Sequence, residues 1–330
     1  MNSDFYIITG CAGFLGSNLA RAILSKNSSN FVLGLDNFST GLSENIQKLK
    51  QDFSENSFCF INFDVTKEFF GLVPPNIQAR LKSFENRFVL HFASAASPPL
   101  YKKLAIETLW VNSIGLKNCL DWAEKFDARV VFASTSEIYG DPLVHPQTET
   151  YWGNVNPIGV RACYDEAKRF GEALISSHNR VFGPKHGWVR IFNTYGPGMN
   201  PTDGRVIINF LIQAIKKEDL TIYGKGGQSR SFCYVDDLVD GILRYTQSKI
   251  YEPVNLGNPN EFTILELSEA VKKLFPYLLK IKFLEESQDD PKVRRPDIGR
   301  AQNLIGWTPK TNLAQGLEKT LTWLKTEMDF

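Results

Sequence analysis

Residues 9–16, Thr9-Gly10-Cys11-Ala12-Gly13-Phe14-Leu15-Gly16, lie where a short apolar run gives way to an amphipathic one, and this junction decides the fold. The run Phe5–Thr9 predicts a buried strand, and Gly13–Ser25 predicts a helix with one apolar face. Glycines at such a junction permit a tight turn and let the backbone approach a pyrophosphate, whose charge the helix N-terminus favours. The sequence therefore predicts a dinucleotide-binding turn, with contacts from Gly10, Gly13, Phe14, Leu15 and Gly16.

Asp36 supports this prediction, because it ends the second expected strand, twenty positions after Gly16. A carboxylate there can accept hydrogen bonds from both ribose hydroxyls, and its charge would repel a 2′-phosphate. The sequence therefore predicts NAD rather than NADP as cofactor. The other expected cofactor-binding residues are Asn37, Asp64, Val65 and Ala93.

Apolar runs alternate with amphipathic stretches through most of the first two hundred residues. Further strands are expected at Phe31–Leu35, Ser57–Phe63, Phe88–Phe92, Arg129–Ala133 and Trp188–Phe192. Helices are expected at Leu42–Gln51, Leu104–Phe126 and Ala162–Val181. Because parallel neighbours need crossover connections, this order predicts an α/β fold of the Rossmann type, a doubly wound parallel sheet with helices on both faces.

The pattern changes after Gly196, where a turn-rich stretch leads into helices and short strands. Helices are expected at Arg205–Lys216, Val235–Gln247, Ile264–Phe275 and Leu313–Lys325, and a strand at Leu220–Tyr223. The run Pro253–Leu256 predicts another strand of the large sheet. We therefore expect a Rossmann domain over 1–196, to which 231–262 returns, and a smaller α/β substrate-binding region over 197–230 and 263–330.

Composition narrows the possible partners and location. The 37 Lys and Arg residues nearly balance the 36 Asp and Glu residues, for a net charge of +1, so nucleic acid is not predicted as a partner. Five cysteines without CxxC or metal-ligand spacing fit buried thiols in a reducing compartment, and the four histidines share no metal spacing. The apolar runs are too short for a bilayer span. These features predict a cytoplasmic protein without metal or membrane insertion.

Tyr164 and Lys168 stand at positions i and i+4 of an expected helix, and therefore share one face. A lysine cation and a bound nicotinamide cation would favour the phenolate, making Tyr164 a usable base near neutral pH. The strand Arg129–Ala133 delivers Ser134-Thr135-Ser136-Glu137 to the carboxyl end of the sheet, where ligands bind in such folds. A hydroxyl donor, a phenol, a lysine and a dinucleotide turn together predict hydride transfer at a carbinol, with Thr135 polarising the oxygen.

These motifs resemble the extended short-chain dehydrogenase/reductases that modify nucleotide sugars. The resemblance covers nearly the whole chain and includes RIFNTYGP at 190–197, YVDDL at 234–238, RPD at 295–297 and GWTP at 306–309. Within that family, ASAASPP at 93–99, STSEIYG at 134–140, the stretch 145–168, DGRV at 203–206 and QSR at 228–230 are similar to the UDP-glucuronate decarboxylases.

The resemblance implies that NAD oxidises C4 of a UDP-glucuronate ring, that CO2 then leaves C5, and that returned hydride gives UDP-xylose. It places Ser136 and Glu137 with Thr135, Tyr164 and Lys168 in the catalytic group. It also implies substrate contacts from Asn193, Arg205 and Arg230, and a homodimer that pairs the helices Leu104–Phe126 and Ala162–Val181. The region after Gly196 would then bind the nucleotide sugar.

The decarboxylase has three alternatives, of which the 4-epimerase remains the strongest. The similar decarboxylases carry Arg where Gly198 stands, which keeps a nucleotide-sugar 4-epimerase in view, although Glu137 and the stretch 151–159 favour the decarboxylase. A 4,6-dehydratase would need an acid where Ser136 stands. A non-enzymatic NAD sensor would have no need for Tyr164, Lys168 and Thr135 together.

Overall fold

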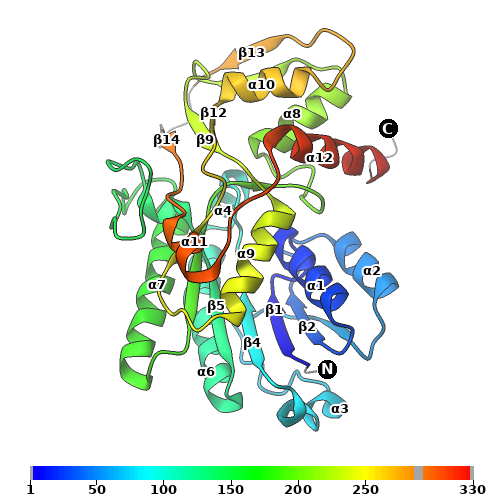
Figure 1. Ribbon diagram of the computed structural model, residues 1–330, viewed down its shortest axis with the longest axis vertical. Coiled ribbons are helices and arrows are strands. Elements are labelled where there is room, and N and C mark those ends of the chain that lie inside the picture. Colours follow the sequence, from blue (N-terminus) through cyan, green and yellow to red (C-terminus); the bar gives the residue numbers. More distant parts are fainter. Residues whose placement is uncertain (1–2, 286–292, 328–330) are drawn as a thin grey trace.

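A seven-stranded parallel sheet forms the centre of the computed structural model, which describes residues 3–285 and 293–327 (Figure 1). Its strand order is β11-β6-β5-β4-β1-β2-β3. The strands are β1 (Phe5–Thr9), β2 (Phe31–Asp36), β3 (Phe58–Asn62), β4 (Arg87–His91), β5 (Arg129–Thr135), β6 (Gly187–Ile191) and β11 (Val254–Leu256). The expected strand at Pro253–Leu256 therefore joins the large sheet, beside β6. The fold is the doubly wound α/β arrangement that the alternating pattern predicts.

The position of β1 creates the crevice in which this class of sheet binds ligands. β1 pairs with β2 on one side and with β4 on the other, so the strand order reverses at this point. Loops that leave the carboxyl ends of strands at such a switch point diverge and open a crevice. The dinucleotide turn follows β1 directly and therefore lies at that crevice.

Two layers of helices cover the sheet, each with its own apolar core. One face packs against α1 (Phe14–Lys26), α2 (Ser43–Asp52) and α9 (Val235–Gln247). The other face packs against α6 (Leu116–Phe126) and α7 (Ala162–Phe182). Strand β1 contributes to both, with Tyr6 and Ile8 in the first core and Phe5 and Ile7 in the second. This alternation is what a strand buried on both faces requires.

The expected helix Leu104–Phe126 is not regular along its length. It consists of α5 (Ala105–Trp110), a π-helical turn (Val111–Gly115) and α6. In this turn, Asn112 Nδ2 donates to the Thr108 carbonyl at 2.8 Å and to Ser94 Oγ at 3.0 Å. These hydrogen bonds tie the turn to the loop after β4, and π turns are found often at functional sites.

Residues 66–87 pack against the same face of the sheet as α6. They contain α3 (Pro75–Gln78) and a 3-10 turn (Leu81–Ser83). Five apolar side chains of the stretch are buried in the second core: Phe69, Val73, Ile77, Leu81 and Phe84. The stretch therefore contributes to the stability of the large sheet.

A smaller region lies above the sheet in Figure 1 and is built from short strands and helices. Its strands are β8 (Leu220–Tyr223), β9 (Ser229–Ser231), β12 (Glu261–Thr263), β13 (Ile281–Leu284) and β14 (Val293–Arg294). Its helices are α8 (Val206–Ile215), α10 (Ile264–Lys272) and α12 (Leu313–Glu327), while α4 (Pro98–Lys103) and α11 (Gly299–Ile305) lie beside the sheet. β13 pairs with β8, and β9 lies between β12 and β14.

The chain passes back from this smaller region to the sheet. β10 (Cys233–Tyr234) pairs with β7 (Thr194–Tyr195), α9 packs on the sheet, and β11 joins its edge. β12 then pairs with β9 in the smaller region. The division expected at 197–230 and 263–330 includes residues 286–292 and 328–330, which lie outside the described part of the chain.

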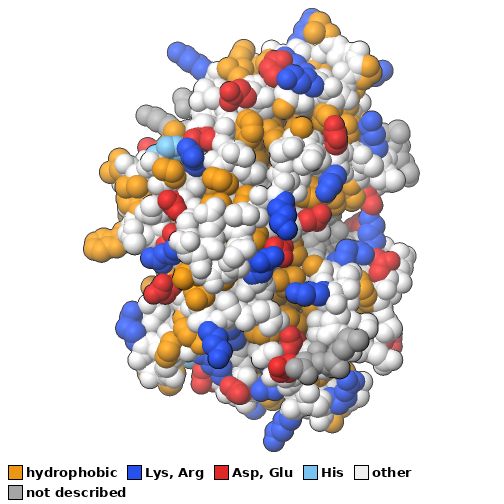
Figure 2. Space-filling view, viewed as in Figure 1, with side chains coloured by type: hydrophobic (Ala, Val, Ile, Leu, Met, Phe, Trp, Pro, Cys, Tyr) orange, Lys and Arg blue, Asp and Glu red, His pale blue; other side chains and the backbone are white. Residues whose placement is uncertain are grey.

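The surface carries both signs of charge. In the view of Figure 2, Lys and Arg side chains alternate with Asp and Glu side chains across the face that α9 and α1 cover. Within residues 3–285 and 293–327, no helix combines the length and the apolar character that crossing a membrane requires.

Candidate active site

The turn between β1 and α1 requires glycine, because its backbone packs closely against neighbouring backbone. Gly10 has φ +74°, and a Cβ there would lie 2.7 Å from the Ala93 backbone nitrogen. A Cβ on Gly16 would lie 2.1 Å from the Gly10 carbonyl oxygen. Helix α1 begins at Phe14 without a side-chain cap and without an acidic residue in its first turn. Its first N–H groups therefore remain available for an anion at the crevice.

Asp36 stands at the end of β2 with its carboxylate fixed by the turn. It accepts hydrogen bonds from the Ala12 N–H at 3.0 Å and the Phe38 N–H at 2.7 Å. Burial raises the pKa of Asp36, and these backbone hydrogen bonds oppose that shift. The side chain is thereby held rigidly at the mouth of a cavity.

That cavity contains all the residues predicted for the adenosine half of the cofactor. Its lining includes Asp36, Asn37, Asp64, Val65 and Ala93. Within the described part of the chain, the lining also includes Glu107 but no Lys or Arg. Apolar walls with several carboxylates and no cation suit an adenine and an unphosphorylated ribose better than a 2′-phosphate.

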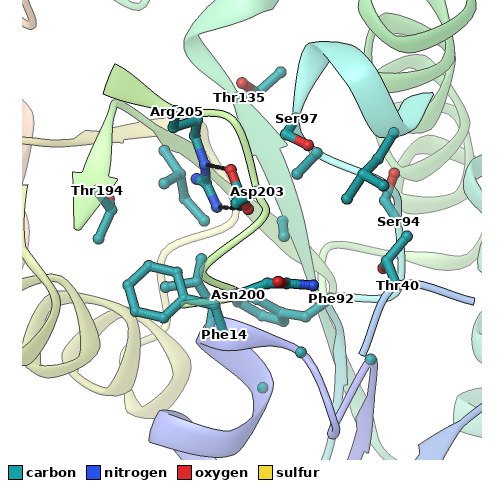
Figure 3. A pocket seen from close by; sticks show the side chains of 18 of the residues that line it. Phe14, Thr40, Phe92, Ser94, Ser97, Thr135, Thr194, Asn200, Asp203 and Arg205 are labelled. Carbon is teal, nitrogen blue, oxygen red and sulfur yellow. Dashed lines mark hydrogen bonds and ion pairs between the residues drawn. The ribbon is translucent and has the colours of Figure 1, made fainter. Parts of the chain in front are cut away.

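A second cavity lies next to the first, because Thr40 and Ser94 line both. Its lining includes the turn residues Gly10, Gly13, Phe14, Leu15 and Gly16, and the polar residues Thr135, Ser136, Glu137, Tyr164, Lys168, Asn193 and Arg205. Figure 3 shows how Thr135, Ser97 and Arg205 surround it, with Phe14 at its base. The dinucleotide turn and the expected catalytic group therefore face one space.

Tyr164 and Lys168 lie in the first turns of α7, buried at 6% and 2% exposure. The Tyr164 ring stacks on the Tyr101 ring, with centroids 5.0 Å apart and 7° between planes. Lys168 Nζ lies 5.7 Å from the Tyr164 ring centroid and donates to the Ala133 carbonyl at 2.8 Å. The i and i+4 spacing thus places both groups at the end of β5.

The electrostatics of this group differ from the sequence expectation in one respect. Burial, with a smaller effect of the Glu137 charge, holds the pKa of the Tyr164 phenol above its usual value, and a hydrogen bond with Thr135 and the charge of Arg205 only partly oppose that shift. Burial also lowers the pKa of Lys168 to about 7. Lys168 therefore changes charge near neutral pH, and Arg205 is a second cation that favours the phenolate.

Glu137 is held between two arginines that the sequence analysis did not select. Its carboxylate pairs with Arg161, which precedes α7, and with Arg294 of β14. Burial alone would raise the pKa of Glu137, but Arg294 and Arg161 overcome burial and lower it. Both arginines lie next to motifs that the sequence does indicate: Arg161 precedes Tyr164 by three residues, and Arg294 adjoins the RPD motif. Only tertiary folding brings them together.

The three predicted substrate-binding residues do not form one group. Asn193 and Arg205 line the second cavity, but Arg205 makes a bidentate pair with Asp203 at 2.5 and 2.8 Å (Figure 3). Its guanidinium also lies 5.9 Å from the ring centroid of Phe14, over the dinucleotide turn. Arg230 is buried at 8% exposure and donates to the Ser229 carbonyl. Its charge helps to lower the pKa of Glu137. The described lining of the second cavity does not include Arg230.

Glu124, His178 and His186 place possible ligand atoms within 4.8 Å of one another, away from this crevice. His186 Nδ1 accepts a hydrogen bond from the Val130 N–H at 3.0 Å. The neutral imidazole must then carry its proton on Nε2, the atom that faces Glu124 at 3.5 Å. A protonated Nε2 has no lone pair for a cation, so this tautomer does not suit a metal.

The sheet, the uncapped helix N-terminus at its switch point and the adjoining Tyr–Lys–Thr group define a dinucleotide-dependent enzyme of the Rossmann class. A model of the NAD dependent epimerase/dehydratase family matches residues 6–257. The chain belongs to this family and is an NAD-dependent enzyme of the extended short-chain dehydrogenase/reductase type.

Named relatives are similar over nearly the whole chain. UDP-glucuronic acid decarboxylase 6 of Arabidopsis thaliana is 45% identical over 322 residues, covering 96% of this chain and 89% of the relative. UDP-glucuronic acid decarboxylase 1 of Danio rerio is 44% identical over 323 residues, covering 98% and 73%. The crystal structure of a UDP-glucuronic acid 4-epimerase from Bacillus cereus, in complex with UDP-glucuronic acid and NAD, aligns with a TM-score of 0.83 at 25% identity, covering 98% and 99%.

The residues of this chain fit NAD. The uncapped start of α1 offers N–H groups to a pyrophosphate, and Gly10 and Gly16 let the turn pack tightly against neighbouring backbone, so that the helix begins directly at the cavity. Asp36 and the cation-free cavity suit the adenosine half, while Tyr164 and Lys168 border the other half.

Proposed function

We propose that this chain converts UDP-glucuronate into UDP-xylose and CO2 through a 4-keto intermediate, with NAD recycled at each turnover. NAD, when bound, supplies the hydride acceptor for C4 of the sugar and later the hydride donor. The 45% identity to a named UDP-glucuronic acid decarboxylase over 96% of the chain supports the reaction.

The catalytic group has the geometry for the first step. Tyr164 accepts the proton of the C4 hydroxyl as its phenolate, and Thr135 donates a hydrogen bond to the same oxygen. Arg205 favours the phenolate by its charge, and Lys168 holds the neighbouring ribose. General bases placed in this way contribute rate factors of about 10² to 10⁴.

The second step needs groups that stabilise the negative charge of an enolate, and it needs a source of protons. After C4 is a ketone, the C6 carboxylate is β to it, so CO2 leaves with its bonding electrons passing into an enolate. C5 then takes a proton, so each turnover consumes one proton for each CO2 released. Arg294 and Arg161 are not in the described lining of the cavity, but they hold the carboxylate of Glu137, which is, and Ser136 provides a hydroxyl there.

The ion pairs of Glu137 with Arg161 and Arg294, here called the Glu137 cluster, are the observation that favours the decarboxylase over the 4-epimerase. An epimerase must let its 4-keto sugar rotate, and it has no need for a carboxylate fixed between two arginines beside the ring. Here Arg294 is 2% exposed and Glu137 lies on the same turn as Ser136. We infer that the cluster orients the sugar carboxylate and keeps the ring from rotating.

Incubation with NAD and UDP-glucuronate tests the proposal, with UDP-glucose and UDP-galactose in parallel. We expect CO2 and UDP-xylose from UDP-glucuronate and no interconversion of the neutral sugars. Epimerised UDP-glucuronate without CO2 would instead support a 4-epimerase, the alternative suggested by Gly198 in place of the arginine of similar decarboxylases.

We further propose that the protein is a homodimer through α5, the π turn and α7. Apolar side chains on these elements are exposed: Ile106 at 59%, Leu109 at 36%, Trp110 at 51%, Ile114 at 41% and Phe170 at 50%. Large apolar side chains exposed in this number on neighbouring elements are typical of an association site. Light scattering on wild-type protein and on Leu109→Glu tests this, with a monomer expected for the variant only.

A cytoplasmic location is supported by the thiols. All five cysteines are unpaired, three of them buried. Free thiols persist in reducing compartments. Fractionation of cells that express the chain with its native termini tests the location.

A further inference from the structure

We propose that Asn255, a residue outside the cavity, is a positioning residue for the decarboxylation step, because its amide sets the geometry of Glu137 against Arg294. This inference rests on the proposed function. Asn255 lies in β11, is fully buried, and is absent from the described lining of the cavity. It can therefore act on the reaction only through the segments that it holds.

One side of the Asn255 amide holds the turn that carries Glu137. The Tyr139 hydroxyl donates to Asn255 Oδ1 at 2.8 Å, and Tyr139 ends the 3-10 turn Ser136–Tyr139. The same hydroxyl accepts from Arg190 Nη1 at 3.0 Å, and Arg190 makes a bidentate pair with Glu172 of α7. The turn of Glu137 is thereby fixed to the helix that carries Tyr164 and Lys168.

The other side of the amide holds the segment that carries Arg294. Asn255 Nδ2 donates to the carbonyl of Asp297 at 3.1 Å and to the carbonyl of Gln147 at 3.0 Å. Gln147 in turn exchanges hydrogen bonds with Arg295: its N–H donates to the Arg295 carbonyl at 2.9 Å, and its Oε1 accepts from the Arg295 N–H at 2.8 Å. Residues 294–297 therefore cannot shift without breaking bonds to this amide and its partner.

The Asn255 side chain thus joins the segment of Glu137 to the segment of Arg294. These two residues are in contact although 157 positions separate them in the sequence. Buried polar networks of this kind fix one arrangement, because any displacement leaves donors or acceptors unsatisfied. The oxidation step depends on Tyr164 of α7, on Thr135 at the end of β5 and on the cofactor beside β1, and neither of these two residues, both in the described part of the chain, makes a hydrogen bond to the Asn255 amide. We therefore expect the Asn255 amide to matter for loss of CO2 more than for oxidation at C4.

The partition of turnovers between two products separates this role from a merely structural one. Full-length protein is incubated with NAD and UDP-glucuronate, and mass spectrometry measures the ratio of released 4-keto sugar nucleotide that retains its carboxylate, whose formation leaves an equivalent of NADH, to UDP-xylose. Unfolded molecules form neither product, so a loss of stability lowers both without changing the ratio. Displacement of the Glu137–Arg294 pair slows decarboxylation and raises the ratio.

Asn255→Asp turns both donor bonds into contacts between acceptors, and we expect the ratio to rise about tenfold or more. Tyr139→Phe removes only the bond toward the Glu137 turn and is expected to raise the ratio in the same direction. It remains informative if Asn255→Asp does not fold. The matched control is Asn258→Asp, at a residue 5% exposed in the loop after β11, which should leave the ratio unchanged.

Unchanged ratios in both Asn255→Asp and Tyr139→Phe, with wild-type protein producing UDP-xylose, would overturn this inference alone. An equal rise in Asn258→Asp would also overturn it, because any disturbance near β11 would then suffice. Wild-type protein that forms neither product from UDP-glucuronate contradicts the proposed function and the inference with it.

Discussion

The two ends of the active site are built in different ways. The cofactor end consists of backbone from consecutive residues, Gly10 to Gly16, and of strand ends that a rigid sheet aligns. The sugar end consists of side chains from distant segments, and its central contact joins Glu137 to Arg294. The first end depends mainly on one strand-turn-helix unit and on the alignment of neighbouring strand ends, as in the contact of Asp36 with the Ala12 N–H. The second exists only when the smaller region docks correctly.

This difference explains why a change at one end should not have the same signature as a change at the other. A defect at the cofactor end affects NAD binding and therefore every step. A defect at the sugar end should leave NAD binding intact and alter what happens to the oxidised sugar.

Tyr164→Phe removes the group on which both ends depend. We expect the rate of the chemical step to fall by about 10²-fold to 10⁴-fold, because Tyr164 is the group that takes the C4 hydroxyl proton in the proposed first step. Single-turnover kinetics with UDP-glucuronate measure the change, and NAD titration provides the control for folding. Near wild-type turnover with intact NAD binding would exclude Tyr164 as the base.

Arg294→Met breaks the sugar end while keeping most of its buried volume. Arg294 holds the Glu137 carboxylate beside the cavity, and a small displacement of a group in an active site can cost about 10²-fold in rate. We expect this loss in CO2 release but not in the NAD dissociation constant. Arg295→Met, at the neighbouring position, is the matched control. Equal losses in the two variants would mean that the segment is only structural.

The contrast also accounts for what the sequence could and could not predict. Asp36 and the Gly10–Gly16 turn were predictable, because spacing along one strand-turn-helix unit determines their positions. Arg161 and Arg294 were not, because nothing in their local sequence indicates that a carboxylate from η3, the 3-10 turn Ser136–Tyr139, will lie between them. Arg205 remains a predicted sugar contact and lines the cavity, but its contact with Phe14 of the dinucleotide turn could not be read from the sequence.

The π turn within the expected helix Leu104–Phe126 shows the same limit. Its apolar spacing predicts a helix, and most of the stretch is helical. The irregularity comes from partners outside the helix: Asn112 bonds to Ser94, and His91 Nε2 bonds to the Val111 carbonyl at 3.0 Å. A local pattern contains no information on such partners.

His91 gives the cofactor end a dependence on pH. It is fully buried beneath that end, where its Nδ1 accepts from the Thr9 hydroxyl at 2.8 Å. Burial, with a smaller effect of Lys168, lowers its pKa from 6.5 to about 3. The native state therefore keeps His91 neutral, while the unfolded state becomes protonated below pH 6.5. Its contribution to stability is complete above that pH and is lost as the pH falls toward 3.

Urea unfolding of wild-type protein and His91→Asn at pH 7 and pH 5 measures this effect. One shifted pKa unit corresponds to about 1.4 kcal/mol, so we expect His91 to account for about 2 kcal/mol of the loss in wild type between these pH values. The variant should be less stable at pH 7 but should lose less on acidification. An identical loss in both proteins would show that another group titrates.

Asp36→Asn tests how far charge alone sets the cofactor end. The amide keeps the shape of the side chain and one acceptor for the Ala12 or Phe38 N–H, but it removes the negative charge that faces a 2′-phosphate. We expect the ratio of the NADP to NAD dissociation constants to fall about tenfold, equivalent to about 1.4 kcal/mol. Calorimetric titration with both dinucleotides measures the ratio. Asp64→Asn removes a charge from the same cavity and should change the ratio less, because Asp64 follows the neighbouring strand β3. If both variants changed the ratio equally, the cavity would reject the phosphate by its summed charge, and the cofactor end would be no more local than the sugar end.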